Sequence, residues 1–510
     1  MDRALGKMVV GNILATAAIR HPKSPAIYCA GTGRRFTFEQ LDNRTNQLGH
    51  ALINAGFRKG HVVAFLSSNR SELVEIYFAL ARTGIIGLPL NYRFSPNEVL
   101  DMMRSVEASG LIYENKFAAT AQQASHLVRS LIQIGGEAPD SALAYEDFLS
   151  NSPSCALDIE VEESDPFYFN LTSGTTGLSK SYILTQYNNS TLGPLYRELD
   201  LCRSDVAMTV FPAFGRVGFA WIAGAMLYGI PNVITNFEPN EVLRLVEAER
   251  VTIFNLVPTM AAMMISAQVT TPRDLSSLRG LVFAGALLPD AVREQTVANL
   301  CPAVFEFYGM QETGVLTLST PDDRVRSPRS VGKAIAFSEV LVVDEHGRRC
   351  APDAIGEIIG RAPTAVTAYF NNPEKSVETF RNGWVHTGDL GSLDEEGFLT
   401  IRGRKKDMIV TGGQNVYAGD VEKIILKHTG VADCAVFGLP DELWGERVVA
   451  LLIGREDAVL DTEELEALCR QNLPGYCIPK QFIVDDQPFP CTPTGKVQKY
   501  LLVERFSQKA

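Results

Sequence analysis

The sequence predicts an α/β protein: a large N-terminal domain of layered, doubly wound sheets, a small β-rich subdomain, and a small α+β C-terminal domain. Helical and strand-like runs alternate through roughly the first 300 residues. From about residue 331 the pattern changes to short strands separated by turns. After a charged turn at 403–407, helices and strands become short again. We therefore predict one domain at 1–404, with the β-rich subdomain at about 331–404, and a second domain at 405–510.

End signals define several of these elements. Thr37 and Gln40 form a capping-box pattern that begins a helix, and Gly56 ends it. The elements predicted after this helix are strands at 62–66, 85–90, 110–113, 206–211, 253–257 and 281–283 and helices at 71–83, 239–250 and 289–300. In the β-rich region, strands at 340–343 and 356–359 are separated by a turn at 344–347.

The composition is that of a globular protein, with 510 residues, 46% hydrophobic content and a net charge of -12. The negative charge argues against nucleic acid as a partner, because phosphate backbones attract basic surfaces. The nine cysteines are scattered and lack CxxC spacing with nearby histidines. We therefore expect reduced thiols, a cytoplasmic protein and no histidine–cysteine metal cluster.

Two apolar stretches resemble targeting or membrane segments. The stretch 8–19 is interrupted by Asn12 and lacks a convincing cleavage site, so we expect an amphipathic helix rather than a signal peptide. The stretch 217–231 is uncharged but shorter than the about 20 residues that span a bilayer. It predicts a buried helix, and we expect no transmembrane segment.

A candidate phosphate loop, TSGTTGLSK, follows a buried-strand run that includes Tyr168. Gly174 and Gly177 permit backbone angles closed to other residues, so successive N–H groups can turn toward one anion. Hydroxyl groups and the Lys180 ammonium add donors. The spacing is neither GxxxxGK[ST] nor GxGxxG, and a surface turn is the alternative. The loop residues are Thr172, Ser173, Gly174, Thr175, Thr176, Gly177 and Lys180.

Four further motifs follow in order: YGMQETG at 308–314, HTGDL at 386–390, GRKKDMIVTGGQNV at 403–416 and PTGK at 493–496. Together with the loop they resemble the adenylate-forming (ANL) superfamily of acyl-CoA synthetases, luciferases and peptide-synthetase adenylation domains. The resemblance covers nearly the whole chain. It implies an acid–CoA ligase, in which a carboxylate attacks the α-phosphorus of ATP and CoA then displaces AMP from the acyl-adenylate. It also implies a C-terminal domain that moves between the two half-reactions.

The resemblance assigns most nucleotide contacts. The loop at 172–180, with Thr175 in a catalytic position, would hold the β- and γ-phosphates. Glu312 would bind Mg²⁺ that bridges the phosphates, and Lys496 would contact the carboxylate and the α-phosphate. Asp389 and Arg404 would contact the ribose. The remaining nucleotide-binding candidates are Ala284, Gly285, Ala286, Tyr308, Gly309 and Gln311.

The C-terminal candidates concern the second half-reaction. Lys406 and Asp407 lie where the resemblance places a hinge, and a short polar turn suits a change in backbone angles. Gly412, Gly413 and Gln414 would face the pantetheine tunnel for CoA.

The acyl pocket is marked by a departure from the family pattern. Gly215 stands where many relatives carry histidine or another aromatic residue, which predicts a fatty, aryl or alicyclic acid larger than acetate. Arg216 has two interpretations: it faces a second carboxylate of the substrate, or it points outward or pairs with a backbone carbonyl. The other pocket candidates are Phe214, Val217, Val257, Thr259, Met260, Met310 and Val315.

Two alternatives remain open. One is an acyl-AMP ligase that loads the phosphopantetheine of a carrier protein instead of CoA. The other is a non-catalytic nucleotide-binding regulatory protein, suggested by Gly215 and by Gln311, which replaces the usual threonine or serine. The expected partners are a small carboxylic acid, ATP and CoA, and a homodimer is one alternative for the assembly.

Overall fold

The computed structural model describes residues 6–170, 181–286, 288–455, 458–491 and 497–507. The chain divides into two compact units. Unit 1 comprises Met1–Pro321, Ala334–Glu339 and Arg361–Val385, and unit 2 comprises Asp322–Lys333, Val340–Gly360 and His386–Ala510. The domain boundary at 404/405 stays a prediction.

The first sheet of unit 1 has, among the described residues, the strand order β7-β6-β5-β3-β4-β8-β9. Its strands are β3 (Val62–Leu66), β4 (Ile86–Pro89), β5 (Gly110–Glu114), β6 (Ser130–Ile134), β7 (Leu143–Ala144), β8 (Pro166–Asn170) and β9 (Tyr182–Thr185). Neighbours are parallel except β8 and β9, which are antiparallel. Asn170 and Tyr182 are paired, so the described chain on either side of 171–180 is anchored in this sheet.

The second sheet has, among the described residues, the order β16-β15-β14-β13-β12-β10-β11-β1-β2. Its strands are β1 (Pro25–Cys29), β2 (Arg34–Thr37), β10 (Ala207–Thr209), β11 (Asn232–Ile234), β12 (Ile253–Leu256), β13 (Gly280–Phe283), β14 (Val304–Met310), β15 (Gly314–Ser319) and β16 (Lys333–Ala334). Strands β12, β13 and β14 are parallel neighbours, and β15 returns antiparallel to β14. The carboxyl ends of three strands that are distant in sequence therefore lie side by side.

One apolar cluster, core 1, joins the two sheets. Val63 and Phe65 of β3 belong to it together with Ile253 of β12 and Val282 of β13. Helices α1 (Gly11–Arg20), α2 (Phe38–Asn54), α3 (Ser71–Thr83) and α9 (Arg216–Tyr228) contribute side chains to the same cluster. Nearly every residue of α3 is buried, as expected for a helix inside a core.

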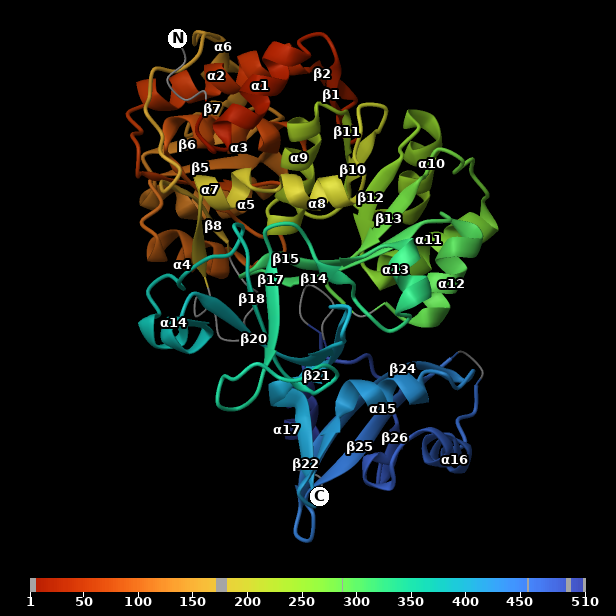
Figure 1. Ribbon diagram of the computed structural model, residues 1–510. Coiled ribbons are helices and arrows are strands. Elements are labelled where there is room, and N and C mark those ends of the chain that lie inside the picture. Colours follow the sequence, from red (N-terminus) through yellow and green to blue (C-terminus); the bar gives the residue numbers. More distant parts are fainter. Residues whose placement is uncertain (1–5, 171–180, 287, 456–457, 492–496, 508–510) are drawn as a thin grey trace. The chain divides into compact units, whose positions relative to one another are not determined.

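The other face of each sheet has its own apolar cluster. Met208, Phe254 and Leu281 pack with side chains of α10 (Pro239–Glu249), α11 (Pro258–Thr270) and α12 (Asp290–Asn299). Figure 1 shows these three helices beside β12 and β13. Ala64 and Leu111 pack with α4 (Pro96–Ser105) and α5 (Ala118–Ala124). Alternate strand residues therefore face opposite clusters, which confirms the predicted layered, doubly wound fold. The other helices before β17 are α6 (Tyr145–Ser150), α7 (Gln186–Ser190), α8 (Gly193–Glu198) and α13 (Pro321–Arg326).

The β-rich segment forms a third sheet, of order β17-β18-β20-β19 with β21 beside β20 in the described chain. Its elements are β17 (Glu339–Val343), β18 (Gly356–Arg361), α14 (Pro373–Thr379), β19 (Phe380–Arg381), β20 (Trp384–Leu393) and β21 (Leu399–Arg404). The last sheet, in unit 2, has the described order β23-β22-β25-β24 with β26 beside β25. Its elements are β22 (Met408–Thr411), β23 (Gln414–Tyr417), α15 (Ala418–Ile425), β24 (Val431–Asp441), β25 (Gly445–Gly454), α16 (Thr462–Asn472), β26 (Gln481–Val484) and α17 (Lys499–Ser507).

The local end signals predicted several boundaries correctly. Helix α2 follows Thr37, whose hydroxyl accepts the Gln40 N–H at 3.3 Å while the Gln40 side chain accepts the Thr37 N–H at 2.9 Å. Helices α1 and α9 confirm the helices expected in the two apolar stretches. Strand β10 ends at Thr209 rather than at Phe211, shortly before Pro212, which has no N–H to continue pairing. In the described part of the chain, none of the helices is both long and apolar enough to cross a bilayer.

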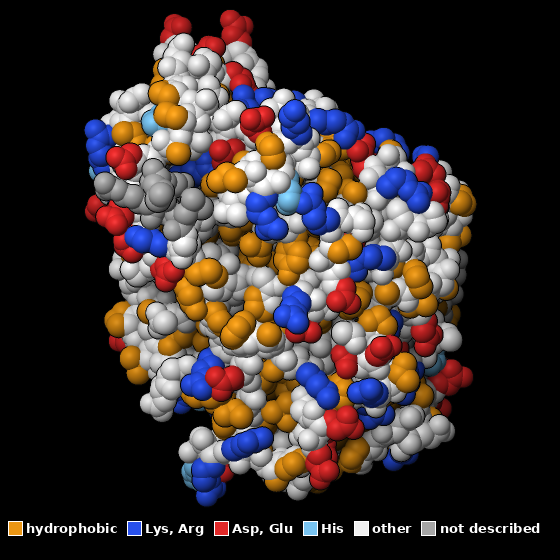
Figure 2. All heavy atoms as spheres, turned by 45° about the horizontal axis from the view of Figure 1, so that its top comes forward, with side chains coloured by type: hydrophobic (Ala, Val, Ile, Leu, Met, Phe, Trp, Pro, Cys, Tyr) orange, Lys and Arg blue, Asp and Glu red, His pale blue; other side chains and the backbone are white. Residues whose placement is uncertain are grey.

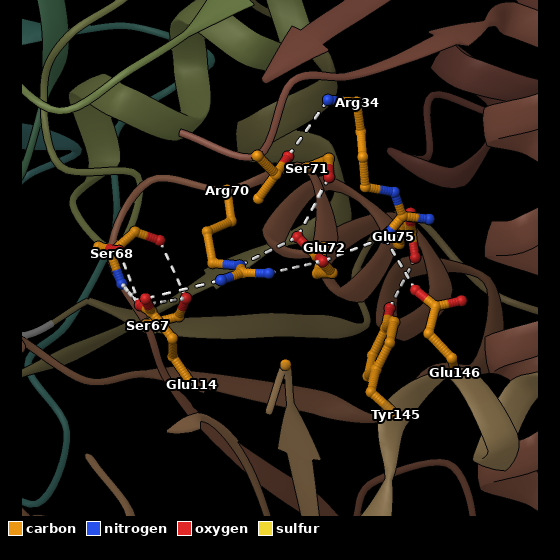
Figure 3. Close-up of polar contacts among 12 residues, drawn as sticks. Arg34, Ser67, Ser68, Arg70, Ser71, Glu72, Glu75, Glu114, Tyr145 and Glu146 are labelled. Carbon is orange, nitrogen blue, oxygen red and sulfur yellow. Dashed lines mark hydrogen bonds and ion pairs between the residues drawn. The ribbon is translucent and has the colours of Figure 1, made fainter. Parts of the chain in front are cut away.

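Charged side chains are also buried in unit 1. Arg44 of α2 donates to both oxygens of Glu75 on α3, at 2.8 and 3.0 Å. The Tyr145 hydroxyl donates to the same carboxylate at 2.8 Å (Figure 3). Glu75 is 0% exposed. Burial raises the pKa of its carboxyl, although Arg44 favours the charged form. This ion pair links α2 to α3 inside the core.

The network continues at the start of α3 (Figure 3). Nη2 of Arg70 lies 3.0 Å from Oε1 of Glu72, and Nη1 of Arg70 lies 3.6 Å from Oε1 of Glu114. The backbone N–H and hydroxyl of Ser68 donate to Glu114 at 2.9 and 2.7 Å. On the molecular face displayed in Figure 2, by contrast, acidic and basic side chains are interspersed in contact with solvent. Charge interactions of very different strength are therefore expected in the two settings.

We expect Arg44→Met to lower the free energy of unfolding by about 3 to 5 kcal/mol, because it leaves the Glu75 carboxylate buried without its cation. The pKa of Glu75 is higher in the folded than in the unfolded chain. The loss of unfolding free energy should therefore be full at neutral pH, and it should shrink as falling pH protonates Glu75. Urea unfolding followed by circular dichroism measures the change. Arg104→Met, which removes a largely exposed pair with Asp101, is the control and should cost about 1 kcal/mol or less. Equal losses in the two variants would contradict the prediction.

Candidate active site

Three of the predicted binding segments follow neighbouring parallel strands of unit 1. Strand β12 leads to Val257, β13 leads to Ala284, Gly285 and Ala286, and β14 carries Tyr308 and Gly309. A Cβ built on Gly285 would lie 3.6 Å from Cγ1 of Val257. Gly285 has a φ of +83°, a conformation that favours glycine. The sheet thus brings the predicted adenine slot and the first acyl-pocket candidate together at strand ends, where α/β folds bind ligands.

Glu312 lies in the turn between β14 and β15 and is 6% exposed. The Tyr369 hydroxyl donates to its Oε1 at 2.7 Å, and the Val366 N–H donates to its backbone carbonyl at 2.9 Å. Burial and the adjacent Glu312 carboxylate raise the pKa of Tyr369, so its hydroxyl stays protonated and remains a donor. The Met310 N–H donates to the Thr313 hydroxyl at 2.9 Å and closes the turn.

Gln311 is hydrogen-bonded through both its side chain and its backbone. The Asn170 amide donates to its Oε1 at 3.1 Å, and the Tyr182 hydroxyl donates to its carbonyl. Asn170 also donates to the Tyr182 hydroxyl at 2.6 Å. The turn that carries Glu312 is therefore bonded to the paired residues that flank 171–180.

The other pocket candidates of unit 1 have different surroundings. Val217 and Val315 pack against core 1, Met260 packs against the cluster beneath α10 to α12, and Thr259 is exposed. The Phe214 ring packs edge-on against Tyr92, with ring centroids 5.3 Å apart.

A Cβ would fit at Gly215 without a clash. The nearest atom to a Cβ built there would be the Pro212 carbonyl oxygen at 3.4 Å, which is ordinary contact. Gly215 is the N-cap of α9 with extended backbone angles that other residues can adopt. Close packing therefore does not explain the glycine at this position.

In unit 2, Asp389 on β20 and Arg404 at the end of β21 are directly paired residues. Arg404 Nε lies 2.9 Å from Asp389 Oδ1, and Asp389 is 6% exposed. The Asp389 N–H donates to the Thr387 hydroxyl at 3.1 Å. The two residues predicted to contact ribose are thus held together by an ion pair.

The remaining candidates of unit 2 lie in two turns. Lys406 and Asp407 belong to a single helical turn, Lys405–Asp407, between β21 and β22. Gly412 and Gly413 form the two-residue hairpin between β22 and β23, with φ of +55° and +74° as such hairpins require, and Gln414 begins β23. A Cβ on Gly412 would lie 2.7 Å from Cε3 of Trp444. Both glycines therefore have a conformational reason besides the predicted tunnel.

Several predicted residues lie outside the described part of the chain. They are Thr172, Ser173, Gly174, Thr175, Thr176, Gly177, Lys180 and Lys496.

Sequence reasoning did not identify Tyr369 or Tyr182. Tyr369 contacts Glu312 from 57 positions away, and Tyr182 contacts Gln311 from 129 positions away. Contacts between such distant positions leave no local pattern to detect.

For Arg216, the structure supports pairing with backbone carbonyls, because its guanidinium donates to those of Gln311 and Thr364.

The donor set fits a magnesium ion that is bound together with phosphates. Glu312 Oε1 accepts the Tyr369 hydrogen bond, while Oε2 accepts none from a described residue. Mg²⁺ prefers hard oxygen ligands and usually combines one or two carboxylates with substrate phosphates and water. The described residues include no group of three or more histidine, cysteine or acidic side chains that could hold a metal ion.

Comparison with known proteins places these segments in a family context. Residues 14–370 match the family model of the AMP-binding enzyme, and residues 420–496 match that of the AMP-binding enzyme C-terminal domain. Fatty acid–[acyl-carrier-protein] ligase ScoC of Streptomyces coeruleorubidus is 28% identical over 96% of this chain and 95% of its own length. Indoleacetate–CoA ligase of Aromatoleum aromaticum is 31% identical over 91% and 92%. The crystal structure of the anthranilate CoA ligase AuaEII in complex with anthranoyl-AMP has a TM-score of 0.88, with 25% identity over 98% of both chains.

We expect Tyr369→Phe to lower the free energy of unfolding by about 1.5 to 3 kcal/mol, because it removes a hydrogen bond to a buried carboxylate. Tyr113→Phe is the matched control, since that hydroxyl donates to the neutral Gln133 amide at 3.1 Å and should be worth about 0.5 to 1.5 kcal/mol. Urea unfolding of both variants, each also in a Glu312→Gln background, measures the difference. A Tyr369 effect that is unchanged by Glu312→Gln would rule out the charged partner as its cause.

Proposed function

Because this chain belongs to the AMP-binding enzyme family, within the adenylate-forming superfamily, we propose that it is an acid–CoA ligase for an acid larger than acetate. The enzyme class, an ATP-dependent ligase that forms AMP, follows from family membership. In the first half-reaction a carboxylate oxygen attacks the α-phosphorus of ATP, and pyrophosphate leaves. In the second, the thiol sulfur attacks the acyl carbon, and AMP leaves.

The observation that carries this proposal is the Glu312 turn, which is bonded to the residues that flank 171–180. The turn follows β14, and β14 is the parallel neighbour of β13, the strand that leads to Ala284, Gly285 and Ala286. The turn orients a buried carboxylate through Tyr369 and leaves its second oxygen for a cation. Mg²⁺ held there would neutralise phosphate charge. Gly285 would admit the adenine ring. We assign the phosphates to the loop at 172–180, the ribose to Asp389 and Arg404, and the reacting carboxylate and α-phosphate to Lys496.

A glycine at position 215, where close packing does not require one, supports a bulky acid. The named acids of two similar proteins, indoleacetate and anthranilate, are aromatic. Arg216 gives no support to a dicarboxylic acid, because it already donates to two backbone carbonyls.

A second candidate acceptor is the phosphopantetheine of a carrier protein, because ScoC is named a ligase for an acyl-carrier protein. Mass spectrometry of the products formed with CoA and with holo-carrier protein separates the two acceptors.

We also propose a cytoplasmic protein, since all nine cysteines are free thiols. Light scattering after size-exclusion chromatography tests the homodimer alternative.

The function is tested by pyrophosphate release with ATP and Mg²⁺ across aliphatic, aromatic, alicyclic and dicarboxylic acids, with and without CoA. We expect a burst without CoA and continuous turnover only with CoA. If ATP binds but every acid fails to release pyrophosphate, the regulatory-protein alternative is favoured.

We expect Glu312→Gln to lower the adenylation rate by about 10²- to 10³-fold, as for other preorganised groups that stabilise developing charge. The loss should be partly offset by a higher Mg²⁺ concentration, because the amide weakens a cation ligand rather than removing a packing group. Pyrophosphate release as a function of Mg²⁺ measures it. Asp101→Asn, a largely exposed acid elsewhere in unit 1, serves as control and should leave the Mg²⁺ dependence unchanged.

We expect Gly215→Leu to lower kcat/KM for aromatic acids by about 10- to 200-fold relative to butyrate, because the side chain would narrow the acyl pocket. Gly31→Leu is the control, since a Cβ at Gly31 has no heavy atom within 4 Å. A uniform loss for all acids would place Gly215 outside the acyl pocket.

A further inference from the structure

We propose that Arg216 is a positioning residue that fixes the turn from Gln311 to Gly314, and with it the Glu312 carboxylate, for the adenylation half-reaction. The inference rests on the role proposed above for Glu312. It concerns the backbone of the turn rather than any contact with the substrate.

The guanidinium of Arg216 joins two separate segments. Arg216 is the first residue of α9 and is 7% exposed. Its Nη1 donates to the Gln311 carbonyl, and its Nη2 donates to the Thr364 carbonyl. Among the described residues it forms these two hydrogen bonds and no ion pair. A rigid, planar fork can hold two carbonyls at a fixed spacing, which a flexible ammonium group cannot.

The two segments joined by Arg216 also bind each other. The Val366 N–H donates to the Glu312 carbonyl at 2.9 Å, and the Thr364 hydroxyl donates to the Thr313 carbonyl at 2.7 Å. Every backbone carbonyl from Gln311 to Thr313 therefore has a donor from outside the turn. The orientation of the Glu312 side chain follows from this fixed backbone, together with the Tyr369 hydrogen bond.

Gly314 shows how closely the segments approach. Its φ is +72°, and a Cβ built there would lie 2.5 Å from Thr364 Oγ1 and 3.3 Å from Arg216 Nη2. Only glycine leaves room for both contacts. The backbone of the turn is therefore adapted to the arginine and threonine beside it.

An arginine at this position is costly as a purely structural device, because a buried cation loses its hydration and has no carboxylate partner among the described residues. Without it, the Gln311 carbonyl keeps the Tyr182 donor, while the Thr364 carbonyl loses a donor. The expected defect is local loosening of the two segments. A misplacement of about 1 Å at a reacting centre can cost about 10²-fold in rate.

The test uses the full-length protein and three variants. Arg216→Met removes both donors, and Arg216→Lys keeps the charge but not the fork. Arg58→Met is the control, because exposed Arg58 also donates to two backbone carbonyls, those of Ile53 and Phe57, at 2.7 Å each.

The first readout is hydrogen–deuterium exchange of peptides that cover residues 308–316 and 361–370. We expect Arg216→Met to accelerate exchange there by about tenfold or more, with other peptides unchanged. Arg58→Met should leave both peptides unchanged. If Arg216→Met does not fold, Thr364→Val, which removes the Thr313 hydrogen bond, is measured in the same way beside Arg216→Lys.

The second readout separates the half-reactions. For Arg216→Met we expect the adenylation rate, measured as pyrophosphate release, to fall by about 10²-fold. Thioester formation from CoA and supplied acyl-adenylate should stay within about twofold, because it does not use the phosphate-binding carboxylate. Arg216→Lys should resemble Arg216→Met in both readouts.

The outcomes separate the inference from the proposed function. Unchanged exchange in Arg216→Met, an equal loss in both half-reactions, or full recovery by Arg216→Lys would each overturn the inference. The two can also be distinguished if no acid supports pyrophosphate release by the wild-type enzyme. If hydrogen–deuterium exchange still rises at the two segments in Arg216→Met, the contact between Arg216 and the turn is supported, and the proposed function is contradicted.

Discussion

A carboxylate buried in a hairpin turn is the constraint on which the candidate site depends. Glu312 has little contact with water, so its oxygen atoms need protein donors or a cation. The protein supplies the Tyr369 hydroxyl to the side chain, and Val366, Thr364 and Arg216 to the backbone of the turn. The β14–β15 hairpin, the segment after β18, the start of α9 and the β8–β9 pair must therefore all be in place before this carboxylate is oriented.

The two large sheets of unit 1 provide that arrangement. Core 1 packs against one face of β12 and β13, and the layer of α10 to α12 packs against the other. The loops that follow β12 and β13 therefore begin from closely packed strands. The buried pair of Arg44 and Glu75 joins two helices of the same core. In unit 2 the paired strands β20 and β21 hold Asp389 against Arg404 in a comparable way.

Family membership explains the common chemistry, and a few residues of this chain indicate how its site differs. A Cβ would fit at Gly215, at the start of α9, without a clash. The guanidinium of Arg216, its neighbour, donates to the backbone of the turn that carries Glu312. Gln311 is bonded to Asn170, so a residue that departs from the family pattern is nevertheless part of the hydrogen-bonded framework. Gly215, a predicted pocket position, is thus adjacent in sequence to the arginine that contacts the Glu312 turn.

The sequence by itself determined the fold class and many local elements. The Thr37–Gln40 capping box begins α2, and the predicted bounds of β3 and α3 are those observed, because these signals act within a few residues. The motifs also identified Glu312, Asp389 and Arg404 as candidates, and Asp389 and Arg404 are paired across two strands. Strand order, the Tyr369 hydrogen bond and the two-carbonyl contact of Arg216 were decided only by the tertiary structure. Each depends on groups that are dozens of residues apart and meet only when the sheets and core have formed.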